Sequence, residues 1–189
     1  MSVATATPCS KIDSHIPKWF AIYTRFKCEK RVCQELERKG VHAYVPLQTV
    51  KRQYTKKVKT HHLPLISCYV FVKITQREYI SVLETDNVVD FVRFAHQLIA
   101  IPEQEIHILK RVTMEPDILE SIEANASGFE VGDKVEIIAG NLTGLKGKLL
   151  AKEGKKYMVV ELEQLGYFLQ LKVATQLLNK VENQPRMAA

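Results

Sequence analysis

The chain has 189 residues, of which 46% are hydrophobic, 25% charged and 8% aromatic, as is usual for a globular protein. No apolar run approaches the roughly 20 residues that a transmembrane helix needs, and the start of the chain lacks the apolar segment of a secretory signal. We therefore expect a cytoplasmic protein with no membrane segment. The net charge of +6 divides into +8 over residues 1–100, −4 over 101–128 and +2 over 129–189. This distribution favours a phosphate-attracting surface in the first half, with a solvated basic face as the alternative.

The first predicted elements are a strand, a helix and a second strand. Residues 1–17 are small and polar and are expected to be disordered. The run WFAIY at 19–23 is aromatic and β-branched, which predicts a strand. Residues 27–39 carry an apolar stripe at helical spacing, and Gly40 follows where a left-handed C-terminal cap is favoured. A second strand is predicted over 41–45.

A basic hairpin and a further alternation of strand and helix complete the predicted first domain. Residues 48–62 alternate basic with apolar side chains and contain no acid, which predicts an exposed hairpin. The later elements are a central strand over 65–74, a short helix over 77–83, a strand over 88–94 with Val89 and Phe91 on one face, and a helix that starts at Pro102. This order predicts an α+β sandwich with an antiparallel sheet, of the ferredoxin-like type.

Short strands separated by glycines predict a second, all-β domain. A short helix is predicted over 117–124, within a helical or flexible linker at 115–128. From residue 129, four β-like segments alternate with glycine-bearing turns, which is the pattern of a small five-stranded antiparallel barrel. The predicted domains are 18–114 and 129–181, followed by a disordered tail over 182–189.

The sequence offers little material for catalysis. The cysteines are Cys9, Cys28, Cys33 and Cys68, and no pair has C-x-x-C spacing, so we predict reduced thiols and no zinc site. The sequence contains no phosphate-binding loop, no G-x-S-x-G and no H-E-x-x-H. We therefore predict a binding module that uses no cofactor and no metal, and not an enzyme.

Two segments resemble parts of one known family. The run GDKVEIIAGNLTGLKG at 132–147 resembles the KOW motif, G-D-x-V-x-I-x-x-G-x-x-x-G-x-x-G. The matching positions are Gly132, Asp133, Val135, Ile137, Gly140, Gly144 and Gly147. In the first domain, the runs WFAIY at 19–23, EKR at 29–31, YVP at 44–46 and YVF at 69–71 resemble the N-terminal domain of the NusG family. The combination of the two segments is specific to that family, and the resemblance covers residues 18–181.

The resemblance implies a transcription elongation or antitermination factor. The N-terminal domain of this family docks an apolar depression onto the clamp helices of RNA polymerase, and holding the clamp closed suppresses pausing and termination. The docking residues implied by position are Tyr23, Leu65, Ile66, Tyr69 and Phe94. Burial in the core is the alternative for each of them, although one-sided apolar patches on a small domain usually mark interfaces. Most relatives carry Pro-Gly where this chain has Ser67-Cys68, which predicts a different start of the strand.

Cations near the start of the first helix predict a contact with nucleic acid. Arg25, Lys27, Lys30 and Arg31 lie where the helix dipole opposes positive charge, so helix stability does not explain them. In specialised relatives this region touches the displaced non-template DNA strand, which suits a groove for single-stranded nucleic acid. The hairpin cations that would approach upstream DNA are Lys51, Arg52, Lys56, Lys57 and Lys59. A solvated basic face and an edge that resists aggregation are the respective alternatives.

Three functions remain open on the sequence alone. The run FVRF at 91–94 and the long second helical region resemble specialised paralogues of the RfaH and UpxY type, which implies an antiterminator of capsular polysaccharide operons. The second function is a general elongation factor whose barrel recruits a ribosomal protein or a termination factor. The third is a KOW-containing protein that binds RNA or the ribosome. Because the last 60 or so residues are rich in strand formers, we predict a barrel there instead of the helical hairpin of some specialised relatives.

Overall fold

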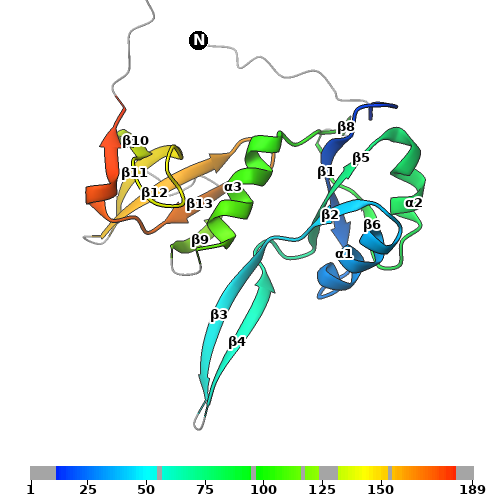
Figure 1. Ribbon diagram of the computed structural model, residues 1–189, viewed down its shortest axis with the longest axis horizontal. Coiled ribbons are helices and arrows are strands. Elements are labelled where there is room, and N and C mark those ends of the chain that lie inside the picture. Colours follow the sequence, from blue (N-terminus) through cyan, green and yellow to red (C-terminus); the bar gives the residue numbers. More distant parts are fainter. Residues whose placement is uncertain are drawn as a thin grey trace, which may run out of the picture. The chain divides into compact units, whose positions relative to one another are not determined.

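The chain folds into two compact units, each built on an antiparallel sheet (Figure 1). The computed structural model describes residues 12–54, 57–94, 97–115, 118–123, 132–152 and 155–181. The units are Met1–Ile106 and His107–Ala189. Their border therefore falls earlier in the chain than the segment 115–128, where the composition of the sequence changes.

The first unit is built on a four-stranded sheet in the order β2-β5-β1-β6. The strands are β1 (Lys18–Thr24), β2 (His42–Tyr44), β5 (Tyr69–Ile74) and β6 (Val88–Phe91). The helical elements are α1 (Glu29–Arg38), the 3-10 turn η1 (Gln76–Glu78) and α2 (Tyr79–Leu83). Apolar residues of α1 and α2, among them Leu36 and Val82, share one core with Phe20 and Val72 of the sheet. The predicted α+β sandwich is confirmed.

The basic segment forms the predicted hairpin. Strands β3 (Leu47–Tyr54) and β4 (Lys57–Pro64) pair only with each other, from Leu47 opposite Pro64 to Tyr54 opposite Lys57. Figure 1 shows the hairpin as a long ribbon that extends away from the four-stranded sheet. A second, shorter pair joins β7 (Arg93–Phe94) to β8 (Gln97–Leu98).

The central strand starts later than predicted. The expected strand over 65–74 begins only at Tyr69, because residues 65–68 form a bend and a turn. Cys68, at the end of that turn, has a φ of 64°, in the left-handed region that strands do not use.

The prediction that Val89 and Phe91 share a face is wrong, because β6 contains a β-bulge. Val89 is 61% exposed, whereas Phe91 is 2% exposed. The ladder passes directly from Asp90 to Val88 on β6, so Val89 has no partner on β1 and is the extra residue of a bulge. Such a bulge shifts the side-chain alternation by one position and turns Val89 outward.

Cys33 belongs to the core of the first unit. It is 8% exposed and packs in the cluster beneath α1. Burial raises the pKa of its thiol to about 11, and the nearby Glu37 carboxylate adds to the shift. The thiol therefore stays protonated at neutral pH and packs as a small apolar side chain.

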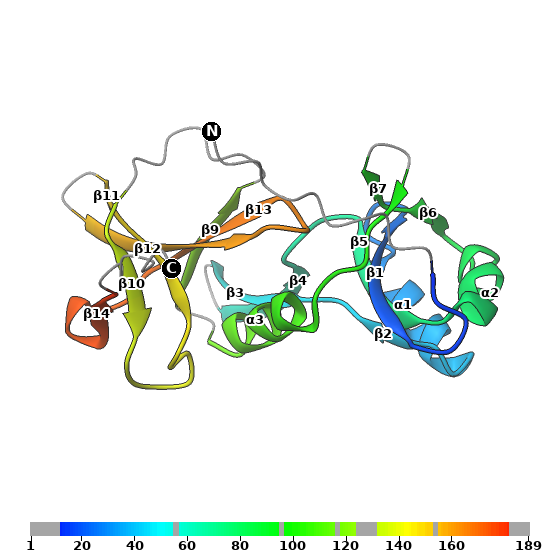
Figure 2. The ribbon, with the colours of Figure 1, turned by 90° about the horizontal axis from the view of Figure 1, so that it is seen from above.

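The second unit is built on a six-stranded, barrel-like sheet in the order β14-β10-β11-β12-β13-β9 (Figure 2). The helix α3 (Glu103–Thr113) begins in the first unit and ends in the second. The strands are β9 (Leu119–Glu123), β10 (Lys134–Ile137), β11 (Lys146–Lys152), β12 (Lys155–Leu162), β13 (Tyr167–Leu171) and, after the turn η2 (Thr175–Leu177), β14 (Leu178–Lys180). The prediction of a barrel instead of a helical hairpin is confirmed.

The predicted helix over 117–124 is wrong, since residues 119–123 form β9. This strand pairs with β13 and places Ile122 opposite Leu169, which is fully buried. The sheet therefore has six strands where five were expected. A segment of five residues with one partner strand has no periodicity long enough to separate it from a short helix.

Thr24 provides a stability test of the first core. Its side chain is 4% exposed, and its hydroxyl has no hydrogen-bond partner among the described residues. Because valine has nearly the same shape without the unsatisfied hydroxyl, Thr24→Val is expected to raise the free energy of unfolding by about 1 kcal/mol. Denaturant unfolding followed by Trp19 fluorescence measures it, since Trp19 is the only tryptophan and lies on β1.

Thr85 is the matched control for this substitution. It is 3% exposed, but its hydroxyl donates to the carbonyl of Ser81 and accepts from Lys39. Thr85→Val removes both bonds and is expected to lower the unfolding free energy by about 1–2 kcal/mol. Equal shifts for Thr24→Val and Thr85→Val would contradict the assignment of an orphaned hydroxyl.

Candidate interaction surface

Two tyrosines form a partly exposed pair at one end of the four-stranded sheet. Tyr23 near the end of β1 lies opposite Tyr69 at the start of β5. The Tyr69 hydroxyl donates to the Tyr23 hydroxyl at 2.9 Å, and the rings meet edge to face with centroids 4.9 Å apart. Tyr23 is 39% exposed and Tyr69 is half-buried. The tyrosine pair therefore presents both apolar ring surface and hydroxyl groups to a partner.

The tyrosine pair lies on the sheet face that points away from α1. Residues opposite one another in a ladder share a face, so Trp19 and Phe71 lie on this face too. Trp19 is 2% exposed and Phe71 is fully buried. Tyr44 stacks on Phe71 with ring centroids 6.3 Å apart. The accessible aromatic surface of this face therefore belongs to the tyrosine pair and to the half-buried Tyr44.

Two further residues that were expected to dock, Leu65 and Ile66, are buried. Leu65 and Ile66 are 5% and 4% exposed, so neither presents a docking surface in this conformation. They lie in the turn before β5, where the sequence has no periodicity that separates covered from uncovered side chains. The side chain of Phe94 lies outside the described part of the structure.

The turn before Tyr69 is held by a buried carboxylate. Glu29, in the first turn of α1, is 3% exposed, and its Oε1 accepts from the backbone N–H of Cys68 at 2.7 Å. The carbonyl of Cys68 accepts from the N–H of Thr24 at 2.9 Å. The left-handed Cys68 stands where the resemblance expects a glycine, which adopts that conformation without strain. Ser67 and Cys68, where a different start of the strand is predicted, therefore lie in a turn that a buried carboxylate holds in place.

The cations at the start of α1 are all on the surface. Arg25, Lys27, Lys30 and Arg31 are exposed. Within the described part of the chain, no ion pair joins any of them to a carboxylate. Lys30 donates to the backbone carbonyl of His62, which brings the start of α1 against strand β4 of the hairpin.

One exposed aromatic residue near the start of α1 was not predicted from the sequence. Phe26 lies between Arg25 and Lys27 and is 67% exposed. The Lys27 ammonium lies 5.1 Å from the centre of its ring. The exposure of Phe26 was indicated in the sequence by the two cations that flank it, in a segment between a predicted strand and a predicted helix. Aromatic residues among cations are typical of surfaces that bind single-stranded nucleic acid.

The hairpin cations are described only in part. Lys57 and Lys59 are exposed on β4. The backbones of Lys51 and Arg52 lie on β3, opposite Thr60 and Lys59. The side chains of Lys51 and Arg52, and the whole of Lys56, lie outside the described residues. The predicted approach to upstream DNA stays a prediction.

The residues of the KOW motif shape the start of the second sheet. Val135 and Ile137 are 2% exposed and alternate with exposed or half-buried neighbours on β10. Asp133 forms an ion pair with Lys180 at 2.6 Å.

The glycines of the motif occupy positions where a larger residue would lack room or adopt a strained backbone angle. Gly132 has no room for a side chain, because a Cβ there would overlap the carbonyl oxygen of Leu149. The turn glycines Gly140 and Gly144 have φ of 86° and 81°, and Gly147 lies against β12. The motif is thus structural in this unit.

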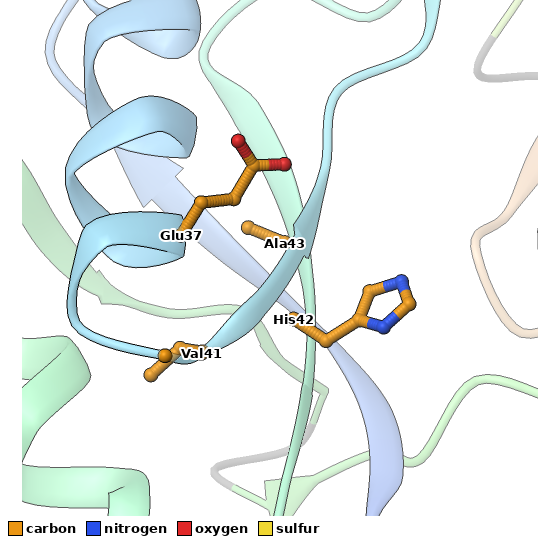
Figure 3. Close-up of a pocket in the computed structure, with 5 residues that line it drawn as sticks. Glu37, Val41, His42 and Ala43 are labelled. Atoms are coloured by element: carbon orange, nitrogen blue, oxygen red, sulfur yellow. The ribbon is translucent and has the colours of Figure 1, made fainter.

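Figure 3 shows an open pocket beside α1 that does not form a reactive site. It is lined by Glu37, Gly40, Val41, His42 and Ala43. The His42 imidazole points away from the Glu37 carboxylate and packs on Trp19 with ring centroids 5.1 Å apart. Among the described residues, no three His, Cys, Asp or Glu side chains gather as metal ligands. No helix in the same residues is long and apolar enough to cross a bilayer.

Comparison with known proteins identifies the first unit. Residues 17–110 match the family model of NusG, described as transcription termination factor nusG. No curated protein matches the sequence. Among solved structures, the fold is similar to that of Thermotoga maritima NusG, with 22% sequence identity, a TM-score of 0.52, and 88% of this chain and 98% of that chain covered. Two conformations, A and B, of the MjSpt4:Spt5 complex match with 20% identity and TM-scores of 0.30, covering 86% and 87% of this chain and 97% of theirs.

Proposed function

Because the first unit of this chain belongs to the NusG family of transcription factors, we propose that the chain binds RNA polymerase and promotes processive transcription. The tyrosine pair carries this proposal. Tyr23 and Tyr69 are large aromatic residues, partly exposed and fixed to each other by a hydrogen bond. Tyrosines held rigidly at the surface lose little conformational freedom on binding, and they are enriched among residues that dominate interface energies.

The clamp helices of the polymerase are the proposed contact. An apolar ring surface bordered by hydroxyl groups suits a helical partner that buries aliphatic side chains and offers polar groups at the rim. The buried Glu29–Cys68 contact fixes the turn from which Tyr69 projects. The pair is therefore preorganised before binding, which lowers the entropic cost of association.

Substitution of Tyr69 tests this contact. Tyr69→Asp is expected to weaken binding to RNA polymerase by about 30-fold or more, because it removes a ring and places a carboxylate without a partner in the interface. Tyr69→Phe removes only the hydroxyl and is expected to retain most of the affinity. Binding is measured with the purified polymerase and the full chain.

Ile80 supplies the matched control. It is 57% exposed on α2 of the same unit, away from β1 and β5 in sequence. Ile80→Asp should leave the polymerase affinity unchanged. Trp19 fluorescence checks that both proteins are folded. If Tyr69→Asp then binds the polymerase as tightly as the unchanged chain, the tyrosine pair is not the docking surface.

We further propose that the cations near the start of α1 contact the displaced non-template DNA strand. Arg25 and Arg31 are exposed, and neither has a carboxylate partner among the described residues. Unpaired cations attract phosphates over the distance of a Debye length and release counterions on contact. The Lys30–His62 contact adds the base of the hairpin to the same side of the unit.

The proposed targets are particular operons, such as those for surface polysaccharides. The likeness of residues 91–94 to specialised paralogues supports this choice. Deletion of the gene distinguishes it from a general factor: one or a few long transcripts are lost in the first case, and transcription changes globally in the second. The second unit is proposed to recruit a ribosomal protein or a termination factor.

A further inference from the structure

The turn that joins β1 to α1 is unusual in carrying an exposed aromatic side chain at its tip. Arg25, Phe26, Lys27 and Cys28 form a β-turn closed by a hydrogen bond from the Cys28 N–H to the Arg25 carbonyl at 3.0 Å. The Arg25 N–H donates to the carbonyl of Asn87 at 2.9 Å, so the first residue of the turn is also fixed. Phe26 at the tip is 67% exposed.

The backbone of this turn is strained at the residue after Phe26. Lys27 has a φ of 63°, a conformation for which glycine or asparagine is favoured at the third position of a turn. Lysine there costs stability that a glycine would restore. Its side chain bends over Phe26, with the ammonium 5.1 Å from the ring centre. The strained residue thus carries a cation beside an aromatic ring.

The surroundings of Phe26 are positively charged. Arg25, Lys27, Lys30 and Arg31 lie within six residues of it and are exposed. The acid nearest in sequence, Glu29, is buried and bonded to the Cys68 amide. None of these cations has a carboxylate partner among the described residues. An exposed ring among such cations is poorly suited to an apolar protein partner, because such a partner would have to bury several charges. It suits a ligand that joins flat π surfaces to a chain of negative charges.

We propose that Phe26 is a stacking platform for one unpaired base of a single-stranded DNA, whose phosphates the neighbouring cations hold. This inference rests on the proposed contact between the α1 cations and DNA and adds to it the residue that recognises the base. Stacking on an aromatic ring tolerates any base, while the cations track the backbone. A ring fixed on a closed β-turn needs little reorganisation to receive the base.

The binding of the full chain to a short oligothymidylate, measured by fluorescence anisotropy, tests the proposal. Phe26→Ala is expected to weaken binding by about tenfold, the usual loss for one stacked base, and Phe26→Trp to retain it. Ile80→Ala, which removes an apolar side chain that is 57% exposed on α2, should leave the affinity unchanged. An oligouridylate of equal length shows whether the platform also accepts RNA.

An abasic strand of the same length separates stacking from charge. The unchanged chain and Phe26→Ala should bind this strand with equal affinity, because only phosphate contacts remain. A tenfold loss on the abasic strand as well would overturn the stacking role. If Arg31→Ala weakens binding to oligothymidylate and Phe26→Ala does not, the platform is refuted and the proposed DNA contact stands. If the unchanged chain binds no strand, both are refuted.

Lys27→Gly distinguishes a role in DNA binding from a role in the fold alone, because stability and DNA affinity are expected to change in opposite directions. Relief of the left-handed strain is expected to raise the stability of the first unit, while loss of the cation beside Phe26 is expected to weaken DNA binding several-fold. Stability and affinity that fall together would instead show that the turn serves only the fold.

Discussion

Replacing Gly132 by alanine is expected to destabilise the second unit by about 4 kcal/mol or more, a loss that few single substitutions reach. Gly132 directly precedes Asp133, whose carbonyl accepts from the N–H of Leu149 at 2.8 Å. A Cβ at Gly132 would overlap the carbonyl oxygen of the same Leu149. Because the obstacle is backbone, no side-chain rotation relieves it, and the start of the β10–β11 ladder has to separate.

The position of the only tryptophan makes this prediction specific to one unit. Trp19 lies in the first unit, so its fluorescence follows the unfolding of that unit alone. Circular dichroism follows the strands of both units. Gly132→Ala is expected to lower the midpoint of the transition seen by circular dichroism and to leave the Trp19 transition in place.

Gly144 is the control for a glycine that is needed for its backbone angle alone. It has a φ of 81°, but a Cβ there would meet no atom within 4 Å. Gly144→Ala should therefore cost only about 1 kcal/mol, the usual price of a left-handed alanine. If Gly132→Ala is no more damaging than Gly144→Ala, the close approach of Leu149 does not determine the choice of glycine.

Alternating and helical patterns in the sequence predicted most elements of the fold. The run at 19–23, the helix with Val32 and Leu36 on one stripe, and the basic hairpin are all present where the patterns placed them. In each case the pattern extends over at least five residues and is local in sequence: apolar residues mark a buried strand or helix face, and unbroken basic charge marks an exposed hairpin. The KOW glycines were found for the same reason, since their spacing is set by turns that are local in sequence.

Features that depend on pairing between distant segments were missed. The bulge at Val89 exists because of the register that β6 adopts on β1, and nothing in the local sequence fixes that register. Strand β9 is defined by its ladder with β13, more than 40 residues later. Leu65 and Ile66 are as apolar as residues of a docking face, so the sequence alone did not show that they are covered.

The candidate site was predicted by residue type but not by arrangement. The resemblance identified Tyr23 and Tyr69, and the structure adds that they are opposite in the ladder and joined by their hydroxyls. Phe26 was not identified because an aromatic residue by itself does not distinguish exposure from burial, and the cations on either side of it, Arg25 and Lys27, were the only local signal of exposure. Its exposure became evident only with the turn that ends β1.

A fragment of residues 128–181, which contains the whole barrel as the sequence predicted it (129–181), is expected to fail to fold as a stable monomer. It lacks β9, whose ladder runs along β13 from Phe168 opposite Glu123 to Leu171 opposite Leu119. Loss of this strand uncovers the core residues Leu169 and Leu171, which are fully buried in the intact unit. It also leaves β13 as an unpaired edge, which favours association between chains.

A fragment of residues 103–181 is the matched comparison and is expected to unfold cooperatively. It keeps β9 and also Arg111 of α3, whose guanidinium donates to the carbonyls of Asn141 and Thr143 at 2.7–2.9 Å. These bonds hold the turn between β10 and β11, and bonds from a charged donor contribute about 1.5–3 kcal/mol each. Denaturant unfolding with light scattering compares the two fragments. A monomeric 128–181 fragment with the same midpoint as 103–181 would show that β9 and α3 are dispensable, and that the barrel begins where the sequence suggested.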